Sequence, residues 1–281
     1  MKIWHRVAWA PRDDIKESLK SVGVKYDWPD PNLLIVLKIE ETDPKWPLVS
    51  RLIKQWGGAH DVWTEFTEEE ILAAEWLVAL PARSIGHPAE SHWSATYYDL
   101  SSQCPTCRTG WRQRAPFSIQ RKPNLGKYHF AGFWGGYELF CTLEVVSTFE
   151  EEGLCGYEVW PVLRGKRRQE PVVELRQLLV PHIAQPALVT ERVDGGRFAD
   201  EPYVPEQCPT CGAILYSHIL RGMIPLRREA LRSDVDFQIT WEWFGSLGTM
   251  PRREILVSRR VAELYIRRGW KGLHLLPVWL V

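Results

Sequence analysis

The segment Cys208-Pro-Thr-Cys-Gly212 repeats a motif that occurs earlier in the chain as Cys104-Pro-Thr-Cys107. Each Cys-Pro-Thr-Cys turn with the residue after it is called a knuckle here. Such a turn directs two thiolates at one point and leaves backbone N–H groups facing the sulfurs, which makes half of a tetrahedral metal site. The two knuckles therefore predict one structural Zn2+ with four ligands: Cys104, Cys107, Cys208 and Cys211.

A zinc ion held by four thiolates has no open position for water or substrate, so the predicted site is structural rather than catalytic. Two copies with proline at the same place favour this interpretation over a redox-active CxxC pair. His218 follows Cys211 by seven residues and is an alternative ligand. We favour a histidine that is satisfied by hydrogen bonds within the protein.

A second repeat accompanies the knuckles. Residues 137–162 and 253–278 align without a gap at a constant offset of 116 (253 − 137). Both segments predict a short strand, a helix and a second strand, with the helices near 142–152 and 258–268 and a glycine of positive φ at each helix end. The identical pairs are Glu138/Glu254, Val145/Val261, Gly153/Gly269, Gly156/Gly272, Pro161/Pro277 and Val162/Val278.

The predicted fold class is α+β, with a zinc-knuckle pair, two repeated strand-helix-strand units and a small N-terminal α/β unit. Alternating strand and helix patterns define the N-terminal unit over residues 1–90, which we interpret as an accessory unit. Its last helix is predicted to begin with the capping box at 67–70 and to extend to Ala79. Residues 91–281 form the predicted zinc-binding domain. Its two related halves cover about 95–180 and 200–281, and residues 182–206 have the composition of a surface connection.

Composition excludes some classes of protein. The 281 residues carry 35 Lys and Arg against 35 Asp and Glu, so the net charge is zero and gives no general reason for nucleic-acid binding. No stretch approaches the roughly 20 apolar residues of a membrane span, and the N-terminus lacks the pattern of a secretory signal. Four of the six cysteines stand in CxxC pairs, which favours a reducing compartment, and we expect the cytoplasm.

The remaining chemical signals are weaker. No nucleophile elbow, phosphate-binding loop or zinc-protease motif is present, so we expect no enzyme. Asp234 and Asp236 alternate as carboxylates on one strand face would, and we interpret them as a solvent-facing edge. Cys141 aligns with Val257 and is expected to be a buried apolar residue. Arginine doublets occur at 227–228, 252–253, 259–260 and 267–268; they could contact phosphates or an acidic protein face, although ordinary solvation is the default.

Several of these segments resemble one family. The paired CPTC motifs, Phe-Gly-Ser at 244–246, Ile-Leu-Val-Ser at 255–258 and the final Gly-x-x-Gly-x-x-x-x-Pro-Val resemble the bacterial double-CxxCG motif proteins, some of which are immunity partners of polymorphic toxins. The resemblance covers residues 95–281, and the first knuckle has Arg108 where the family pattern has glycine. It implies a non-enzymatic protein that binds and neutralises another protein.

The leading functional hypothesis is therefore a cytoplasmic, zinc-stabilised protein-binding module, an immunity protein that neutralises a cognate bacterial toxin. The candidate partner-binding residues are four arginines of the last helix: Arg259, Arg260, Arg267 and Arg268. The alternative is a zinc-ribbon nucleic-acid-binding protein, in which the same arginines contact phosphates and affinity falls steeply with salt. Membranes are not expected partners.

Overall fold

The protein is described by a computed structural model that covers residues 1–281 except 28–33, 92–93, 122, 135–137 and 166–169. Helices and strands are both present, so the α+β class is confirmed. The chain divides into two compact units. The smaller unit comprises residues 1–68, 191–203 and 219–224; the larger unit comprises 69–190, 204–218 and 225–281.

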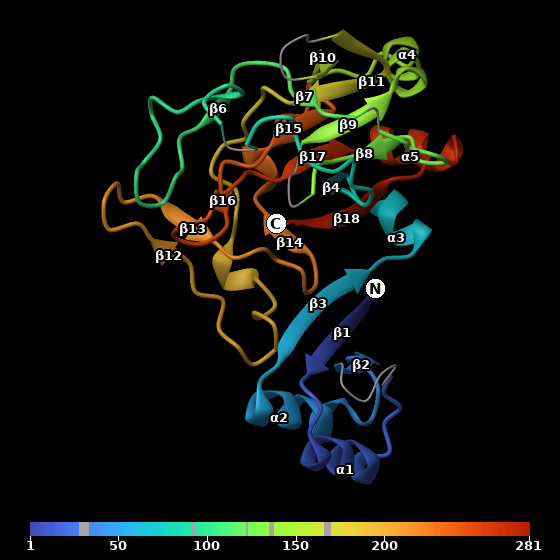
Figure 1. Ribbon diagram of the computed structural model, residues 1–281, viewed down its shortest axis with the longest axis vertical. Helices are drawn as coiled ribbons and strands as arrows, with labels where there is room; N and C mark the ends of the chain where they lie inside the picture. Colours follow the sequence, from blue (N-terminus) through green and yellow to red (C-terminus); the bar gives the residue numbers. More distant parts are fainter. Residues whose placement is uncertain (28–33, 92–93, 122, 135–137, 166–169) are drawn as a thin grey trace. The chain divides into compact units, whose positions relative to one another are not determined.

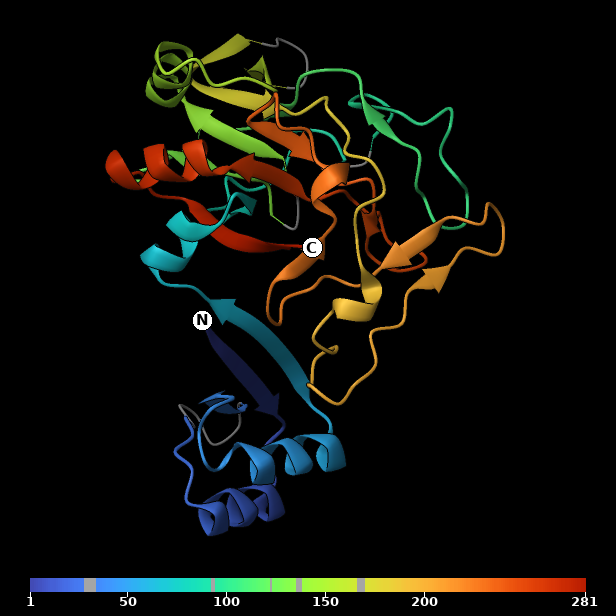
Figure 2. The same cartoon turned by 180° about the vertical axis from the view of Figure 1, so that it is seen from behind.

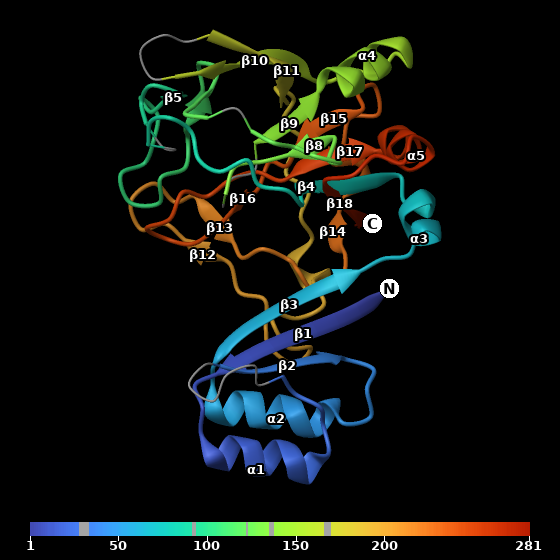
Figure 3. The same ribbon diagram turned by 45° about the vertical axis from the view of Figure 1, so that its right-hand side comes forward.

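The smaller unit is a three-stranded antiparallel sheet with two helices on one face (Figure 3). Its strands are β1 (Lys2–Trp9), β2 (Ile35–Glu40) and β3 (Ala59–Glu65), in the order β2-β1-β3. Helices α1 (Asp13–Val22) and α2 (Trp46–Trp56) bury Leu19 and Val49 against the sheet. The strand and helix alternation of the sequence therefore gives an antiparallel sheet here.

Two later segments belong to the smaller unit. Phe198 packs against its core, and the buried Arg221 donates two hydrogen bonds from Nε and Nη2 to the Glu41 carboxylate, at 3.1 and 2.9 Å. The expectation that residues 182–206 form only a surface connection is therefore wrong. Next to this ion pair, His5 is fully buried with Nδ1 3.0 Å from Nε2 of His60. Burial, followed by the charges of His60 and Arg221, lowers the pKa of His5 to about 3.

The larger unit contains two five-stranded sheets, ordered β7-β10-β11-β9-β8 and β14-β18-β4-β17-β15. The strands of the first are β7 (Ser118–Ile119), β8 (Phe130–Ala131), β9 (Leu139–Thr142), β10 (Glu158–Arg164) and β11 (Glu170–Leu179). The strands of the second are β4 (Trp76–Pro81), β14 (Ile224–Leu226), β15 (Phe237–Ile239), β17 (Ile255–Ser258) and β18 (Leu273–Leu280).

Short elements complete this unit. A sheet ordered β12-β13-β16 consists of β12 (Glu206–Gln207), β13 (Ile214–Tyr216) and β16 (Trp243–Phe244), and a ribbon pairs β5 (Tyr98–Asp99) with β6 (Arg112–Gln113). Helix α3 (Glu68–Ala73) precedes β4, and two 3-10 turns cover Thr190–Arg192 and Arg228–Ala230.

The two predicted strand-helix-strand segments have the same local structure. Strand β9 leads into α4 (Leu143–Glu151) as β17 leads into α5 (Arg259–Arg267), with every bound shifted by 116 residues. Gly153 and Gly269 follow the helices at φ of 64° and 63°, as predicted. Figure 2 shows α4 and α5 beside each other on one side of this unit. Tyr137, the first residue of the aligned segment, lies outside the described residues.

Strand β4 has an unexpected place. It pairs with both β17 and β18 at the centre of the second sheet, where β11 pairs with β9 and β10 in the first (Figure 1). The registers correspond: Pro161 faces Arg176, and Pro277 faces Leu77. The prediction of a helix up to Ala79 within an N-terminal unit of residues 1–90 is therefore wrong: α3 ends at Ala73, and the apolar run that follows is a strand in the core of the larger unit.

Each half also packs its second glycine against the other half. A Cβ on Gly156 would lie 2.5 Å from the carbonyl oxygen of Phe237, and one on Gly272 would lie 2.1 Å from that of Phe130. Phe130 and Phe237 lie on the edge strands β8 and β15, so the two sheets share one apolar core. Glycine is required at both positions because no side chain fits in that space.

Candidate metal centre

The four cysteines of the knuckles form one cluster, with all Sγ atoms within 4.8 Å of one another. Cys104 Sγ lies 3.8 Å from Cys208 Sγ, and Cys107 Sγ lies 3.5 Å from Cys211 Sγ. Four sulfurs at Zn–S bond length around a tetrahedral ion are separated by about 3.8 Å. The sulfurs are much further apart than the roughly 2 Å of a disulfide bond, and all six cysteines are free thiols. The cluster could therefore hold one metal ion.

The two knuckles use equivalent hydrogen bonds. Cys104 N–H donates to Thr109 O at 2.9 Å, and Cys208 N–H donates to Ala213 O at 2.8 Å. The N–H that follows each motif closes the turn: Arg108 donates to Cys104 O at 2.8 Å, as Gly212 does to Cys208 O at 3.0 Å. Because every one of these atoms is related to its counterpart by 104 residues, the thiols approach the centre as two copies of one structure.

Arg108 has the same left-handed backbone conformation as the glycine at the equivalent position of the second knuckle. Arg108 has φ of 59° and is the only non-glycine residue at positive φ among the described residues, while Gly212 has φ of 74° in the other knuckle. A left-handed conformation disfavours residues with a Cβ by roughly 1–2 kcal/mol. The departure from the glycine of the CxxCG pattern therefore leaves the turn unchanged but requires arginine to adopt a strained backbone.

The protein environment lowers the pKa of two of the four thiols, Cys104 and Cys208. Backbone N–H groups, first that of Cys107, lower the pKa of Cys104. Burial opposes ionisation of Cys208, but the N–H groups of Cys211 and Thr210 and the neighbouring thiols outweigh it and lower the pKa to about 6. Burial raises the pKa of Cys107 to about 12, although the Thr109 hydroxyl, 3.1 Å from its sulfur, favours the thiolate. A metal ion would displace the remaining protons.

Side chains from both halves enclose the cluster. Cys104, Cys107 and Cys208 are buried with Leu215, and Cys211 is exposed. The threonines in the middle of the two motifs, Thr106 and Thr210, bring their hydroxyl oxygens to 2.6 Å from each other. The ligand set thus has a shielded side and an open side, and all four positions of a tetrahedral ion are taken by protein sulfurs.

Other residues singled out in the sequence have structural roles. His218 Nδ1 lies 2.9 Å from Glu254 Oε1, which confirms a satisfied histidine rather than a ligand. Cys141 is fully buried, as expected. The expected solvent-facing pair is wrong for Asp236, which is buried and accepts hydrogen bonds from Ser258 Oγ at 2.6 Å and Arg260 Nη1 at 3.0 Å. Asp234 is exposed and forms an ion pair with Arg232.

The four candidate partner-binding arginines differ in their contacts. Arg259 donates to the carbonyl oxygens of Ala74 and Ala73, at 3.1 and 2.7 Å. Arg260 contacts Asp236, and Arg267 forms an ion pair with Glu152. The exposed side chain of Arg268 has no hydrogen bond or ion pair to another described residue. Three of the four arginines therefore bind groups of this chain.

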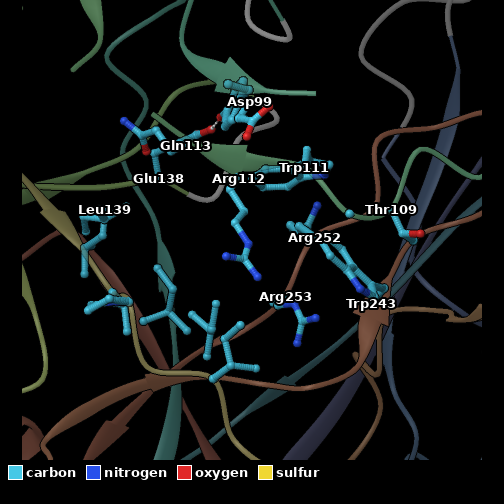
Figure 4. A pocket seen from close by; sticks show the side chains of 18 of the residues that line it. Asp99, Thr109, Trp111, Arg112, Gln113, Glu138, Leu139, Trp243, Arg252 and Arg253 are labelled. Atoms are coloured by element: carbon cyan, nitrogen blue, oxygen red, sulfur yellow. Dashed lines mark hydrogen bonds between the residues drawn. The ribbon is translucent and has the colours of Figure 1, made fainter. Parts of the chain in front are cut away.

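A cavity in the larger unit contains residues that the sequence analysis did not assign to a site. Arg112, Arg252 and Arg253 converge there beside Trp111 and Trp243 (Figure 4). Two signals were present in the sequence, the Arg252-Arg253 doublet and the fifteen tryptophans. Neither identifies a site by itself, because Arg112 and the Arg252-Arg253 pair are 140 residues apart in the chain (252 − 112 = 140) and come together only in the folded unit.

Comparisons with known proteins do not assign the chain to a family. No protein-family model matches the chain, and no curated protein matches it. Within the described part of the chain, no helix has the length and apolar character that crossing a membrane requires.

Proposed function

We propose that this chain is a zinc-stabilised, non-enzymatic protein-binding module of the bacterial double-CxxCG type, an immunity protein that neutralises a cognate toxin in the cytoplasm. The observation that carries the proposal is the four-sulfur cluster, whose geometry suits an ion with four thiolate ligands and no open position. The resemblance of the knuckles and of the C-terminal segment to immunity-type proteins supplies the class of partner.

Zinc is the proposed metal because tetrahedral sites of four thiolates select Zn2+ or iron, and Zn2+ is the usual structural ion. When bound, the ion joins two knuckles that are 104 residues apart. The first knuckle is flanked by β5 and β6, and the second by β12 and β13. Closing so long a loop with a metal fixes both flanking ribbons, and a preorganised surface loses less entropy when a partner binds.

The chemistry of the surface supports a protein partner. Exposed tryptophans and arginines are the residue types that most often dominate interface energy, and Trp134, Trp241 and Arg268 are exposed here. Arg268 is the candidate arginine best suited to a mutational test, because its substitution leaves no described partner without its hydrogen bond or ion pair. The nucleic-acid alternative has less support, since Arg259, Arg260 and Arg267 are engaged within the chain.

Two measurements test the proposal. Elemental analysis of purified protein should give one zinc per chain, without the visible absorption of an iron-thiolate centre. Co-expression with toxin-like products of neighbouring reading frames should restore growth, and the rescued pair should co-elute from a size-exclusion column. Arg268→Ala should weaken that complex, and Arg164→Ala serves as the control. A metal-free folded protein, or salt-sensitive binding of nucleic acid without any rescue, would overturn it.

A further inference from the structure

The cavity of the larger unit has the size and lining of a ligand site. Its volume is about 780 Å³, which lies in the range of 300–1,000 Å³ typical of small-molecule pockets. The lining comes from β5 and β6, from the loop after the first knuckle, from β11, and from the segment between β16 and β17. Parts of the chain that are far apart in sequence therefore create one partly open cavity.

Three arginines give the cavity a positive region. Figure 4 shows the guanidinium of Arg112 extending into the cavity toward Arg252 and Arg253. Burial lowers the pKa of Arg252 to about 9 and that of Arg253 to about 10; the charges of Glu254 and Glu242 oppose these shifts, and the charge of Arg112 lowers the pKa of Arg253 further. Both therefore stay charged at neutral pH, but in surroundings where cationic charge is poorly solvated. An anion in the cavity would offset that cost.

The two acidic residues of the lining, Asp99 and Glu138, already accept hydrogen bonds from other groups of this chain and do not supply that anion. The carboxylate of Asp99 accepts the Ser101 N–H at 3.0 Å, and Glu138 accepts the Tyr98 hydroxyl at 2.7 Å. With three arginines against these two acids, the lining has a net charge of +1 (3 − 2). The Arg112 guanidinium has no hydrogen bond or ion pair to a described residue, so it can bind a ligand without losing another contact.

Aromatic and aliphatic side chains of the cavity offer an apolar surface to the planar part of a ligand. The indoles of Trp111 and Trp243 meet edge to face with centroids 5.5 Å apart, and Trp111 Nε1 is fixed by a hydrogen bond to Pro251 O at 3.0 Å. The Arg253 guanidinium lies over Trp243 at 4.6 Å from the ring centroid. Aliphatic side chains form the rest of the lining: Leu139, Leu178, Ile239 and Ile255.

We propose that this cavity binds a small organic anion, with a carboxylate or phosphate held by Arg112, Arg252 and Arg253 and a planar apolar body against Trp111 and Trp243. A carboxylate and a phosphate both match the planar donor set of guanidinium groups. The tryptophans and aliphatic residues exclude water from the body of the ligand, which strengthens these charge-assisted hydrogen bonds. This site adjoins the sulfur cluster, since Trp243 packs against the cysteines, but its ligand-binding groups are not cysteines and it does not depend on the proposed function.

The test uses three probes that share one body. Isothermal titration of the metal-loaded full chain at pH 7 compares 2-naphthoate, 2-naphthyl phosphate and neutral 2-naphthol. We expect one-to-one binding of at least one anion, at least about tenfold tighter than 2-naphthol, since a charge-assisted hydrogen bond adds roughly that factor. The tighter of the two anions identifies the preferred charged group.

Variants locate the binding. Arg112→Gln should weaken the preferred anion about tenfold, as should Arg253→Gln, while binding of 2-naphthol changes little. Arg112 is exposed and makes no hydrogen bond or ion pair within the part of the chain that the structure describes, so its substitution should leave folding intact even if Arg253→Gln unfolds the protein. Arg164→Gln, an exposed arginine on β10, is the control. Equal affinity for 2-naphthol and the anions, no binding of either anion at millimolar concentration, or unchanged anion affinity in Arg112→Gln would each overturn the proposal.

Discussion

The two halves of the larger unit have nearly the same structure but obtain their central strands differently. The first half takes β11, which follows β10 directly in the chain. The second half takes β4, which lies about 175 residues before its partner β17 (255 − 81 = 174). A repeated strand-helix-strand segment can thus be completed by a neighbouring or a distant strand, provided that its apolar face and register fit.

The halves also differ in charge on their helices. Acidic residues occupy positions 150–152 at the end of α4, and the matching positions of the second half are Ile266, Arg267 and Arg268. The structure brings some of these charges together, because Arg267 pairs with Glu152 and Arg260 donates to the Glu152 carbonyl at 2.9 Å. Part of the divergence between the copies therefore serves the contact between them, whereas the Arg268 side chain has no hydrogen bond or ion pair to another described residue.

Loss of one ligand from either knuckle should produce the largest effect. Cys104→Ser and Cys208→Ser should each abolish stoichiometric metal binding and lower the melting temperature by a similar large amount, because a structural metal contributes directly to folding. Elemental analysis and thermal denaturation measure both results. Cys155→Ser, at an exposed cysteine outside the cluster, should change neither. Metal retention in one variant and not in the other would break the equivalence of the knuckles.

A substitution in β4 tests whether this strand belongs to the second half. Leu77 is fully buried in the core that both halves share. Leu77→Ala should lower the free energy of unfolding of the larger unit by about 2–5 kcal/mol, the usual cost of a large-to-small change in a core. Unfolding in urea is detected by the release of bound metal to a colorimetric chelator, and this signal reports on that unit. Val173→Ala on β11, at an exposed position, is the matched control; equal effects would contradict the assignment.

The glycine contacts between the halves should be nearly as sensitive. Gly272→Ala and Gly156→Ala should each cost about 3 kcal/mol, since a left-handed backbone and a steric overlap with a carbonyl oxygen add together. We expect the larger cost at Gly272, where the approach is 2.1 Å rather than 2.5 Å. Gly269→Ala has the same backbone strain but open space around the Cβ, so about 1–2 kcal/mol should be lost. Denaturant titration distinguishes these values, and equal costs at all three positions would refute the close packing.

Some features could be predicted from the sequence because residue type and spacing determine them locally. The cysteine ligands are an example, since a turn of four residues fixes each pair of sulfurs. The helices α4 and α5 begin and end within a residue or two of their predicted bounds. A glycine of positive φ follows each helix as predicted, but Thr142 and Ser258 occupy the N-cap positions without a side-chain capping hydrogen bond, and Ser258 Oγ donates to Asp236 instead. The glycine conformations follow from the same local chemistry.

Other features depend on long-range pairing that a sequence does not encode locally. The capping box at Thr67 predicts where a helix starts but not how long it is, so the apolar run up to Ala79 was assigned to a helix of the N-terminal unit and not to strand β4. Asp236 was expected in solvent because its partners, Ser258 and Arg260, lie more than twenty residues away. The cavity arginines were missed for the same reason, since Arg112 meets Arg252 and Arg253 only after the sheets form.

The difference between Arg108 and Gly212 offers a smaller, two-sided test. Arg108→Gly should stabilise the protein by up to about 1 kcal/mol, because relief of the left-handed strain exceeds the entropy that glycine adds to the unfolded chain. Gly212→Arg should destabilise the protein by a similar amount, because it introduces the same left-handed strain. Steric overlap should add little, since a Cβ there would meet only Gln207 Nε2, at 3.9 Å. The double variant should have nearly wild-type stability in thermal denaturation. A loss of stability in Arg108→Gly would mean that the arginine side chain itself supports the knuckle.

The ion pair between the two helices should have the smallest effect. Arg267 and Glu152 are both substantially exposed, at 60% and 39% for their side chains, so water and salt screen their attraction. A double-mutant cycle with Arg267→Ala and Glu152→Ala should give a coupling energy of about 0.2–1 kcal/mol, measured by urea denaturation and reduced further in high salt. Arg268→Ala, next to it, should leave stability unchanged. A coupling energy above about 2 kcal/mol would show that the charge divergence of the halves was needed for folding. The small value that we expect means that this pair can be lost without unfolding the chain, which leaves the arginines of α5 and its end available for binding studies in a folded protein.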